Sequence, residues 1–439
     1  MTKTTYYFLG IGGIGMSALA RHFLHQQHRV YGYDKTSTSL TRDLEALGIT
    51  ITYDEGVDAI PSACMSTETQ IIYTPALPKT HPQLVYFQKH SYSVKKRAEV
   101  LGSLSKSMYT IAVGGTHGKT TTTALLAHLM HATNQSFTAF VGGILKGFES
   151  NYIATGTDYL LVEADEYDRS FLQLHPAQIA ITSMDADHLD IYTTAQNLRD
   201  TFVTFSQSTS EGLVHAEGLP LSGLTYGFGA SVDYRAKDLS RTEEGFEFTL
   251  ITPGGTFSKT RLPMLGQHNL MNALGALALG HQLGFDVATM ANALADFQGI
   301  QRRMNRYTWQ NKILIDDYAH HPEEIQAVYN ALRTHYTDLK IGVVFQPHLF
   351  SRTQDFWTAF CQVLELFDTV ALMDIYPARE RPIAGITTDR LLDALSHQEK
   401  TKLHPDQLET YIQTSSCDLI AVLGAGDIGA HFQNLIWTA

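Results

Sequence analysis

The chain has 439 residues, 44% of them hydrophobic, and a formal net charge of −12. This length suggests about three domains, and the acidic balance argues against non-specific binding to nucleic acid. The three cysteines form no closely spaced pair, which argues against a disulfide framework or a zinc site. The first residues lack the basic, apolar, small-residue pattern of a signal peptide, so we expect no leader, and no apolar run approaches the roughly 20 residues of a membrane span. We therefore expect a cytoplasmic protein that binds neither nucleic acid nor a membrane.

The first domain is predicted from apolar strands that alternate with helices. Strands are expected at residues 6–9, 30–33 and 70–73, and a helix from residue 16 to about residue 27. This βαβ alternation predicts a parallel sheet. We place a Rossmann-like domain at residues 1–107.

A glycine loop joins the first strand to that helix. The run from Gly10 to Gly15 has the G-x-G-x-x-G spacing, and Asp34 ends the next strand 19 positions beyond Gly15. Glycines at the start of a helix let backbone N–H groups approach a diphosphate, whatever is attached to it. Both a nicotinamide dinucleotide and a UDP-sugar carry this group, so an NAD-dependent oxidoreductase is one alternative.

The central domain, placed at residues 108–300, is predicted as a second α/β system. Buried strands are expected at residues 109–113, 159–162 and 178–181. Residues 246–251 and 256–262 flank Pro253-Gly254-Gly255, which predicts a hairpin and hence a small antiparallel addition. Helices are expected at about 269–283 and 287–297.

A phosphate loop gives the strongest functional signal in the sequence. It lies between a predicted strand and a predicted helix, where backbone N–H groups and the helix N-terminus can bind phosphate oxygens. It departs from the usual pattern at Val113, where a glycine is common, and an ordinary glycine turn is the alternative. The ATP-binding residues expected here are Gly115, Thr116, His117, Gly118, Lys119, Thr120 and Thr121.

A magnesium site is predicted beside this loop. The hydroxyl of Thr120 is a candidate ligand, and Lys119 would reach the outer phosphates. Glu163 directly follows the strand at 159–162, so it faces the same edge of the sheet. His188 follows the next strand and could hold a second divalent ion. The alternatives are a loop histidine and solvated carboxylates.

The third domain, placed at residues 301–439, is predicted as a second Rossmann-like domain. Its strands are expected at residues 313–315, 341–345, 369–373 and 419–423. The predicted fold class is therefore α/β with three domains, the central one of the phosphate-loop ATPase type.

Several segments together resemble the Mur ligase family. They are the phosphate loop, the Glu-Ala-Asp-Glu stretch at 163–166, the Asp-His pair at 187–188, and two segments at 266–273 and 297–303. The segment at 266–273 is similar to the family's adenine-contacting segment. In the family, an arginine of the segment that corresponds to 297–303 approaches the ATP phosphates. A helix cap, a buried amide or a linker charge remains the alternative for each residue. The resemblance implies ATP-binding roles for His268, Asn269, Asn272 and either Arg302 or Arg303.

The third domain is similar to the alanine-adding branch of the family. The segments at 316–322, 345–353, 374–378 and 424–428 carry this likeness. It implies that Asp317 and His320 contact substrate and that His348 and Arg352 are catalytic. Leu349 stands where the family usually has an arginine, whose role is absent here or falls to Arg352. No lysine occurs between His188 and Lys237, so we predict no carbamylated lysine.

The resemblance implies an ATP- and Mg²⁺-dependent ligase of peptidoglycan synthesis, with two metal ions. It would activate the lactyl carboxylate of UDP-N-acetylmuramate as an acyl phosphate and join it to L-alanine. Closure of the third domain would exclude water. The alternatives are a peptide-adding relative, the NAD-dependent oxidoreductase and a non-enzymatic ATP-binding regulator. We expect a monomer or a homodimer. The implied UDP-sugar-binding residues are Gly12, Gly13, Ile14, Gly15, Asp34 and Thr74.

Overall fold

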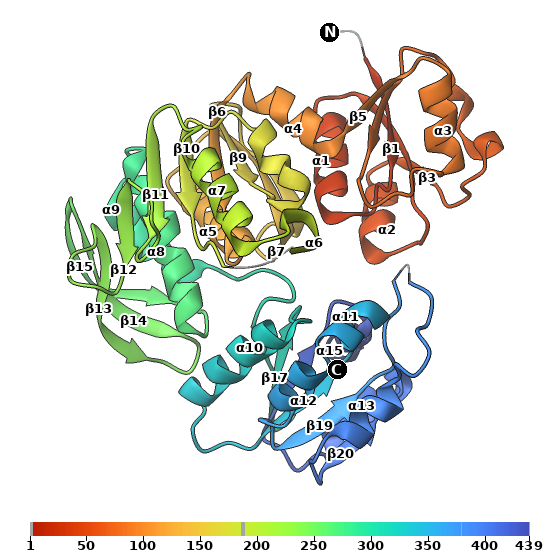
Figure 1. The fold of residues 1–439 in the computed structure, drawn as a ribbon. Helices are drawn as coiled ribbons and strands as arrows, with labels where there is room; N and C mark the ends of the chain where they lie inside the picture. Colours follow the sequence, from red (N-terminus) through yellow and green to blue (C-terminus); the bar gives the residue numbers. More distant parts are fainter. Residues whose placement is uncertain (1–2, 186–188, 379, 439) are drawn as a thin grey trace. The chain divides into compact units, whose positions relative to one another are not determined.

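The structure is a computed structural model that describes residues 3–185, 189–378 and 380–438 (Figure 1). The chain divides into two compact units. The first comprises Met1–Asp238, Phe248–Thr260 and Met271–Gln298, and the second comprises Leu239–Glu247, Arg261–Leu270 and Gly299–Ala439. In the part of the chain that the structure describes, no helix has the length and apolar character needed to cross a membrane.

The N-terminal sheet is wholly parallel, as the βαβ pattern predicts. Its strand order is β3-β2-β1-β4-β5. The strands are β1 (Thr5–Leu9), β2 (Arg29–Tyr33), β3 (Thr50–Thr52), β4 (Gln70–Tyr73) and β5 (Ser93–Lys96). The helices are α1 (Ile14–His25), α2 (Ser39–Ala46), α3 (Pro82–Lys89) and α4 (Arg97–Ser105).

Successive residues of the inner strand β1 belong to two different cores. Phe8 packs in the core that contains residues of α1 and α4, whereas Tyr7 and Leu9 pack in the core that contains residues of α3. Side chains of a strand alternate between its faces, so helices on both faces bury this strand completely.

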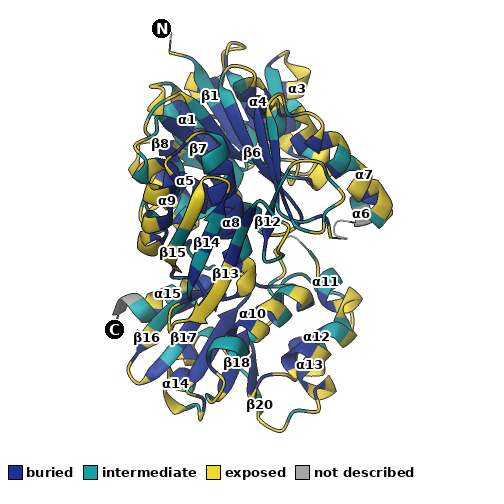
Figure 2. Ribbon diagram, turned by 90° about the vertical axis from the view of Figure 1, so that its left-hand side faces the viewer, coloured by how far each residue is buried: buried dark blue, intermediate teal, exposed yellow. Residues whose placement is uncertain are grey.

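The central sheet contains both the strands around the phosphate loop and the strands of the predicted antiparallel addition. Its order is β15-β14-β13-β12-β11-β10-β6-β9-β7-β8. The strands are β6 (Tyr109–Gly114), β7 (Phe137–Leu145), β8 (Ser150–Ala154), β9 (Tyr159–Glu163), β10 (Gln178–Ile181), β11 (Gly212–Ala216), β12 (Leu224–Gly227), β13 (Tyr234–Arg241), β14 (Phe246–Thr252) and β15 (Gly255–Leu262). Figure 2 shows the contrast between buried β6 and the largely exposed strands β13 and β15.

Several helices and the 3-10 segment η3 accompany this sheet. They are α5 (Lys119–Ala132), η3 (Tyr167–Gln173), α6 (Leu189–Tyr192), α7 (Ala195–Ser206), α8 (Gln267–Gln282) and α9 (Val287–Ala293). One hydrophobic core joins residues of the N-terminal sheet to residues of the central sheet, from Phe8 through Phe140 to Leu213. Helix α1 packs against the hairpin β7–β8, so both glycine loops belong to the same compact unit.

The third sheet has the order β16-β17-β21-β18-β19-β20. Its inner strands β17, β21, β18 and β19 are parallel, and β16 is antiparallel to β17. The strands are β16 (Asn305–Trp309), β17 (Lys312–Asp317), β18 (Ile341–Phe345), β19 (Thr369–Leu372), β20 (Lys400–Lys402) and β21 (Leu419–Leu423). The helices are α10 (Pro322–His335), α11 (Phe350–Asp355), α12 (Trp357–Leu364), α13 (Thr388–Ala394), α14 (Leu408–Thr414) and α15 (Ile428–Thr438).

All strands predicted from apolar runs are confirmed within one or two residues at each end. Helix α1 begins at Ile14, inside the glycine loop, two residues earlier than predicted. The hairpin β7–β8 was not predicted; Gly142 and Gly143 interrupt the apolar run of β7, and glycine is unfavourable in a strand interior.

His22 lies in the contact between α1 and the β7–β8 hairpin. Its ring contacts Phe140, and its Nδ1 atom lies 3.2 Å from the Tyr152 hydroxyl. Burial, reinforced by His25 and His28, lowers the pKa of His22 from 6.5 to about 4. The unfolded chain therefore binds a proton at His22 before the folded chain does as the pH falls.

We expect acid to destabilise the protein through His22. The contribution of neutral His22 to the free energy of unfolding is fully present above the unfolded pKa of about 6.5. It is lost as the pH falls from there toward about 4, and the loss is about 3 kcal/mol at most. The variant His22→Gln does not titrate and keeps a hydrogen-bonding group toward Tyr152. Urea unfolding at pH 7 and pH 4.5 should show a smaller acid loss in His22→Gln than in the parent. Equal losses would contradict the assignment.

Candidate active site

The phosphate loop lies between β6 and α5, and its shape requires glycine. Gly115 and Gly118 have φ values of +141° and +83°. A β-carbon on Gly115 would overlap the hydroxyl of Thr182, and one on Gly118 would overlap the side-chain oxygen of Asn272. The loop is thus enclosed by neighbouring elements and has the backbone freedom that a phosphate cradle needs.

Residues that follow β10 hold this loop from the side. The hydroxyls of Thr116 and Ser183 lie 2.8 Å apart, and the His117 N–H donates to the Ser183 hydroxyl at 2.8 Å. The Thr182 hydroxyl donates to the His117 carbonyl. Sequence reasoning missed Thr182 and Ser183, although their place directly after a predicted parallel strand was a usable signal.

Lys119 is paired with a buried carboxylate. Its ammonium lies 2.7 Å from Glu166 and donates to the Gly115 carbonyl at 2.6 Å. The Glu166 side chain is only 2% exposed. A cation held by a buried anion and by the loop backbone has a fixed position, which suits a residue that must meet phosphate oxygens. Glu166 had no assigned role from the sequence.

Glu163 connects the phosphate loop to β7. The Thr120 hydroxyl donates to one Glu163 oxygen at 2.8 Å, and the Gly142 N–H donates to the other at 2.8 Å. A β-carbon on Gly142 would overlap this carboxylate and lie 3.0 Å from the Thr120 hydroxyl. A hydroxyl beside a carboxylate is an oxygen donor pair of the kind that Mg²⁺ binds together with phosphate and water. His188, the predicted ligand of a second divalent ion, lies outside the described residues.

The adenine-type segment forms the start of α8. Asn272 contacts the first turn of α5, where its side-chain oxygen accepts from the Thr122 hydroxyl at 3.4 Å, and the same oxygen lies against Gly118 of the phosphate loop. Asn269 is buried and donates to the Leu265 carbonyl at 2.8 Å, while His268 is exposed. Thr121 is buried at the first turn of α5. Asn272 of α8 therefore lies directly beside Gly118 of the phosphate loop.

The N-terminal glycine loop is held by Asp34 and Thr74. The Gly12 N–H donates to the Asp34 carboxylate at 2.7 Å, and a β-carbon on Gly10 would lie 2.5 Å from the Thr74 methyl group. Gly13 is the N-cap of α1 and has no side-chain cap, and Ile14 is exposed. The helix N-terminus is therefore open to an anion.

The C-terminal candidates gather in the second unit. The rings of His320 and His348 are 5.8 Å apart, and Arg352 lies 3.5 Å from His348. Burial, with His320 and Arg352 nearby, lowers the pKa of His348 to about 4, and burial also lowers the pKa of His320. Two neutral imidazoles can accept hydrogen bonds from an amine. The neighbouring guanidinium then remains available to bind a carboxylate.

Two further candidates hold the backbone of this unit. Both oxygens of buried Asp317 accept backbone N–H groups, from Met304 and Ala319, at 2.7 Å. Arg302 is turned toward the Gly424 and Gly426 carbonyls.

Arg303 and Leu349 occupy different surroundings in the same unit. Arg303 lies over the Tyr318 ring. Leu349 is the N-cap of α11 and has a φ of +73°, and its N–H donates to the Tyr376 carbonyl. Arg352, one turn along α11, is thus the cation that accompanies His348.

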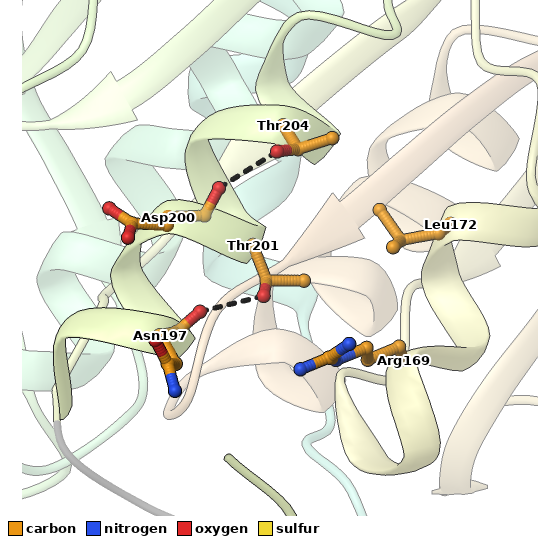
Figure 3. Close-up of a pocket in the computed structure, with 6 residues that line it drawn as sticks. All are labelled: Arg169, Leu172, Asn197, Asp200, Thr201 and Thr204. Carbon is orange, nitrogen blue, oxygen red and sulfur yellow. Dashed lines mark hydrogen bonds between the residues drawn. The ribbon is translucent and has the colours of Figure 1, made fainter. Parts of the chain in front are cut away.

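A surface pocket of the first unit carries no comparable chemistry. Figure 3 shows Arg169 and Leu172 of η3 facing four residues of α7 across a pocket of about 370 Å³. The Thr201 and Thr204 hydroxyls both donate to carbonyls of their own helix. The remaining polar groups include the Asp200 carboxylate, which accepts from Gln196. We assign no catalytic role to this pocket.

The fold and the first unit's site define a phosphate-loop α/β enzyme. Three family models match consecutive parts of the chain: "Mur ligase family, catalytic domain" at residues 5–109, "Mur ligase middle domain" at residues 113–280, and "Mur ligase, glutamate ligase domain" at residues 302–426. Together they cover most of the chain. The chain belongs to the Mur ligase family, and its three-domain α/β architecture agrees with the predicted fold class.

Similar proteins extend over almost the whole chain. Proteins named UDP-N-acetylmuramate–L-alanine ligase from Christiangramia forsetii and Flavobacterium johnsoniae are each 45% identical, over 98% and 96% of this chain and 96% and 95% of their own. The crystal structure of the UDP-N-acetylmuramate-alanine ligase of Thermotoga maritima has a TM-score of 0.82 and 28% identity, covering 99% of this chain and 98% of that one. A murein peptide ligase from Psychrobacter arcticus, at 21% identity and a TM-score of 0.71, shares the fold.

We expect Gly142→Ala to disturb the Glu163 carboxylate without unfolding the protein. The added methyl group must displace Glu163 or Thr120, so the Mg²⁺ concentration needed for half-maximal activity should rise about tenfold or more. The control is Gly147→Ala in the same hairpin, where the nearest atoms lie 3.7 Å or more from the new carbon. Unchanged Mg²⁺ dependence in Gly142→Ala would contradict the metal assignment.

We expect Lys119→Met to lose activity and stability for different reasons. Removing the cation should lower the rate about a hundredfold or more, and it leaves Glu166 buried beside no ammonium, at a cost of about 3 kcal/mol. The double variant Lys119→Met/Glu166→Gln should regain stability in urea unfolding but not activity. Recovery of both would contradict a catalytic role for Lys119.

Proposed function

We propose that this chain joins L-alanine to the lactyl carboxylate of UDP-N-acetylmuramate with ATP, giving UDP-N-acetylmuramoyl-L-alanine, ADP and phosphate in peptidoglycan synthesis. The observation that carries this proposal is 45% identity to proteins named UDP-N-acetylmuramate–L-alanine ligase over 98% of the chain. The site geometry supports it, because a phosphate loop and a separate helix N-terminus suited to a diphosphate occur in one compact unit.

The first chemical step would be phosphoryl transfer. The substrate carboxylate attacks the γ-phosphorus of ATP, the bond to ADP breaks, and an acyl phosphate forms. Lys119 offsets the charge that spreads over the phosphate oxygens, held in place by Glu166 and the Gly115 carbonyl. Thr120 and Glu163 would hold Mg²⁺, whose positive charge favours the same transfer.

The second step would be attack by the amine of L-alanine on the acyl carbon, with phosphate leaving. The ammonium must lose one proton to solvent before it can attack, and the nitrogen loses a second proton to the departing phosphate. His320 and His348 remain neutral at neutral pH because their pKa values are lowered, so they can orient an amine without repelling it. Arg352 beside them is suited to the carboxylate of the amino acid.

A phosphate-release assay tests the proposal. Purified protein is incubated with MgATP, UDP-N-acetylmuramate and, in separate reactions, L-alanine, L-serine, glycine or a cell-wall peptide. We expect rapid phosphate release with L-alanine, with serine and glycine slower by about tenfold or more, because one small group changes binding by about 1–3 kcal/mol. Release that depends on the peptide would assign the chain to the peptide-adding relatives instead. Nicotinamide reduction, or nucleotide binding without turnover, would also overturn the proposal.

A further inference from the structure

The acidic segment after β9 has partners in two different directions. Glu163 and Glu166 face the phosphate loop, where they bind Thr120 and Lys119. The two aspartates of the segment bind basic residues at the junction of β5 and α4 in the N-terminal sheet. Asp165 accepts from Arg97 at 2.7 Å, and Asp168 pairs with Lys96 at 3.1 Å.

Arg97 also lies against the N-terminal glycine loop. A β-carbon on Gly15 would overlap Nη1 of Arg97 and lie 3.1 Å from its central guanidinium carbon. The bond to Asp165 uses the other terminal nitrogen, Nη2. One guanidinium therefore reaches two elements at once, and the nitrogen at Gly15 is free of the bond to Asp165.

The start of α1 is a positive environment even without Arg97. The first turn of α1 contains no acidic residue, and its N-cap, Gly13, has no side-chain cap. The unsatisfied N–H groups there carry partial positive charge. A guanidinium at the same helix end is unfavourable unless an anion accompanies it. Asp165 offsets this charge on one side, and the glycine loop is open on the other.

The same guanidinium borders the ATP side of the unit. Arg97, Asp165 and Glu163 line one small pocket, with Leu101 and Phe171 as apolar walls. The carboxylate assigned to Mg²⁺ and the arginine at the sugar-nucleotide loop therefore share one cavity. Arg97 is only 23% exposed, which limits competition from water.

We propose that Arg97 binds an anionic group of the sugar nucleotide at the start of α1, and that Asp165 is a positioning residue that orients Arg97 from the ATP-binding side. This inference rests on the proposed function. The anionic group is the diphosphate or the lactyl carboxylate, and both are ligands that a guanidinium recognises through charge-assisted hydrogen bonds. Sugar-nucleotide affinity is thereby tied to the segment that carries Glu163 and Glu166.

Calorimetric titration of the full chain with UDP-N-acetylmuramate tests this assignment. Arg97→Met keeps the apolar stem and should raise Kd by about ten- to one-hundred-fold. Asp165→Asn keeps an acceptor for the Tyr167 N–H and should raise Kd about three- to tenfold. The double variant should bind no more weakly than Arg97→Met alone, because Asp165 acts through Arg97.

The neighbouring ion pair supplies matched controls. Lys96 and Asp168 come from the same two segments, but their side chains are 43% and 46% exposed. Lys96→Met and Asp168→Asn should change Kd less than twofold, because exposed pairs contribute little. Thermal unfolding of all variants within a few degrees of the parent keeps an effect on Kd distinct from loss of fold.

A second titration distinguishes the two anions. UDP-N-acetylglucosamine carries the diphosphate but no lactyl carboxylate. Weaker binding of both ligands by Arg97→Met supports the proposal and assigns the diphosphate, and weaker binding of UDP-N-acetylmuramate alone supports it and assigns the carboxylate. Unchanged Kd for both ligands, or additive losses in the double variant, would overturn it. Failure of the parent protein to bind either ligand would instead refute the proposed function.

Discussion

The candidate active site depends on the register of three neighbouring parallel strands. β6 pairs with β9 so that Val113 lies opposite Glu163, and with β10 so that Gly114 lies opposite Ile181. Parallel strands end at one edge of the sheet, so the segments that follow them meet there. The phosphate loop thereby receives a carboxylate from β9 on one side and the Ser183 hydroxyl from beyond β10 on the other. A shift of one residue in either pairing would move these groups to the opposite face.

Close approach of these segments leaves no room for several side chains. Gly115, Gly118 and Gly142 each face a polar side chain that a β-carbon would overlap. At Gly142 the close approach allows a backbone-to-side-chain hydrogen bond, from its N–H to the Glu163 carboxylate at 2.8 Å. Backbone donors are held by the fold itself, so they fix a carboxylate at smaller conformational cost than a long side chain would. The position of Glu163 therefore depends on β7 as much as on its own strand.

The sequence predicts the local parts of this arrangement better than its long-range parts. Apolar runs predict β6, β9 and β10, and the glycines with Lys119 identify the loop between β6 and α5. The pairing of Lys119 with Glu166 could not be predicted, because a run of acidic residues has the same composition whether buried or solvated. Nor does any local pattern show that Arg97 reaches Asp165, 68 positions along the chain.

The core explains why the two glycine loops can act together. The N-terminal and central sheets have separate strand orders, yet α1 buries its apolar face against β7 and β8 in one core with Phe140 and Leu160. A packed core resists small displacements, because any gap forfeits contacts on both sides. The start of α1 and the end of β9 are therefore held at a fixed separation, and a single guanidinium can span it. A half-exposed pair such as Lys96 and Asp168 sets this distance less firmly, because water competes with the bond between them. Rigid packing, with Arg97 bridging the start of α1 and the segment beyond β9, is thus the feature of the first unit that would fix a diphosphate at α1 relative to ATP at the phosphate loop.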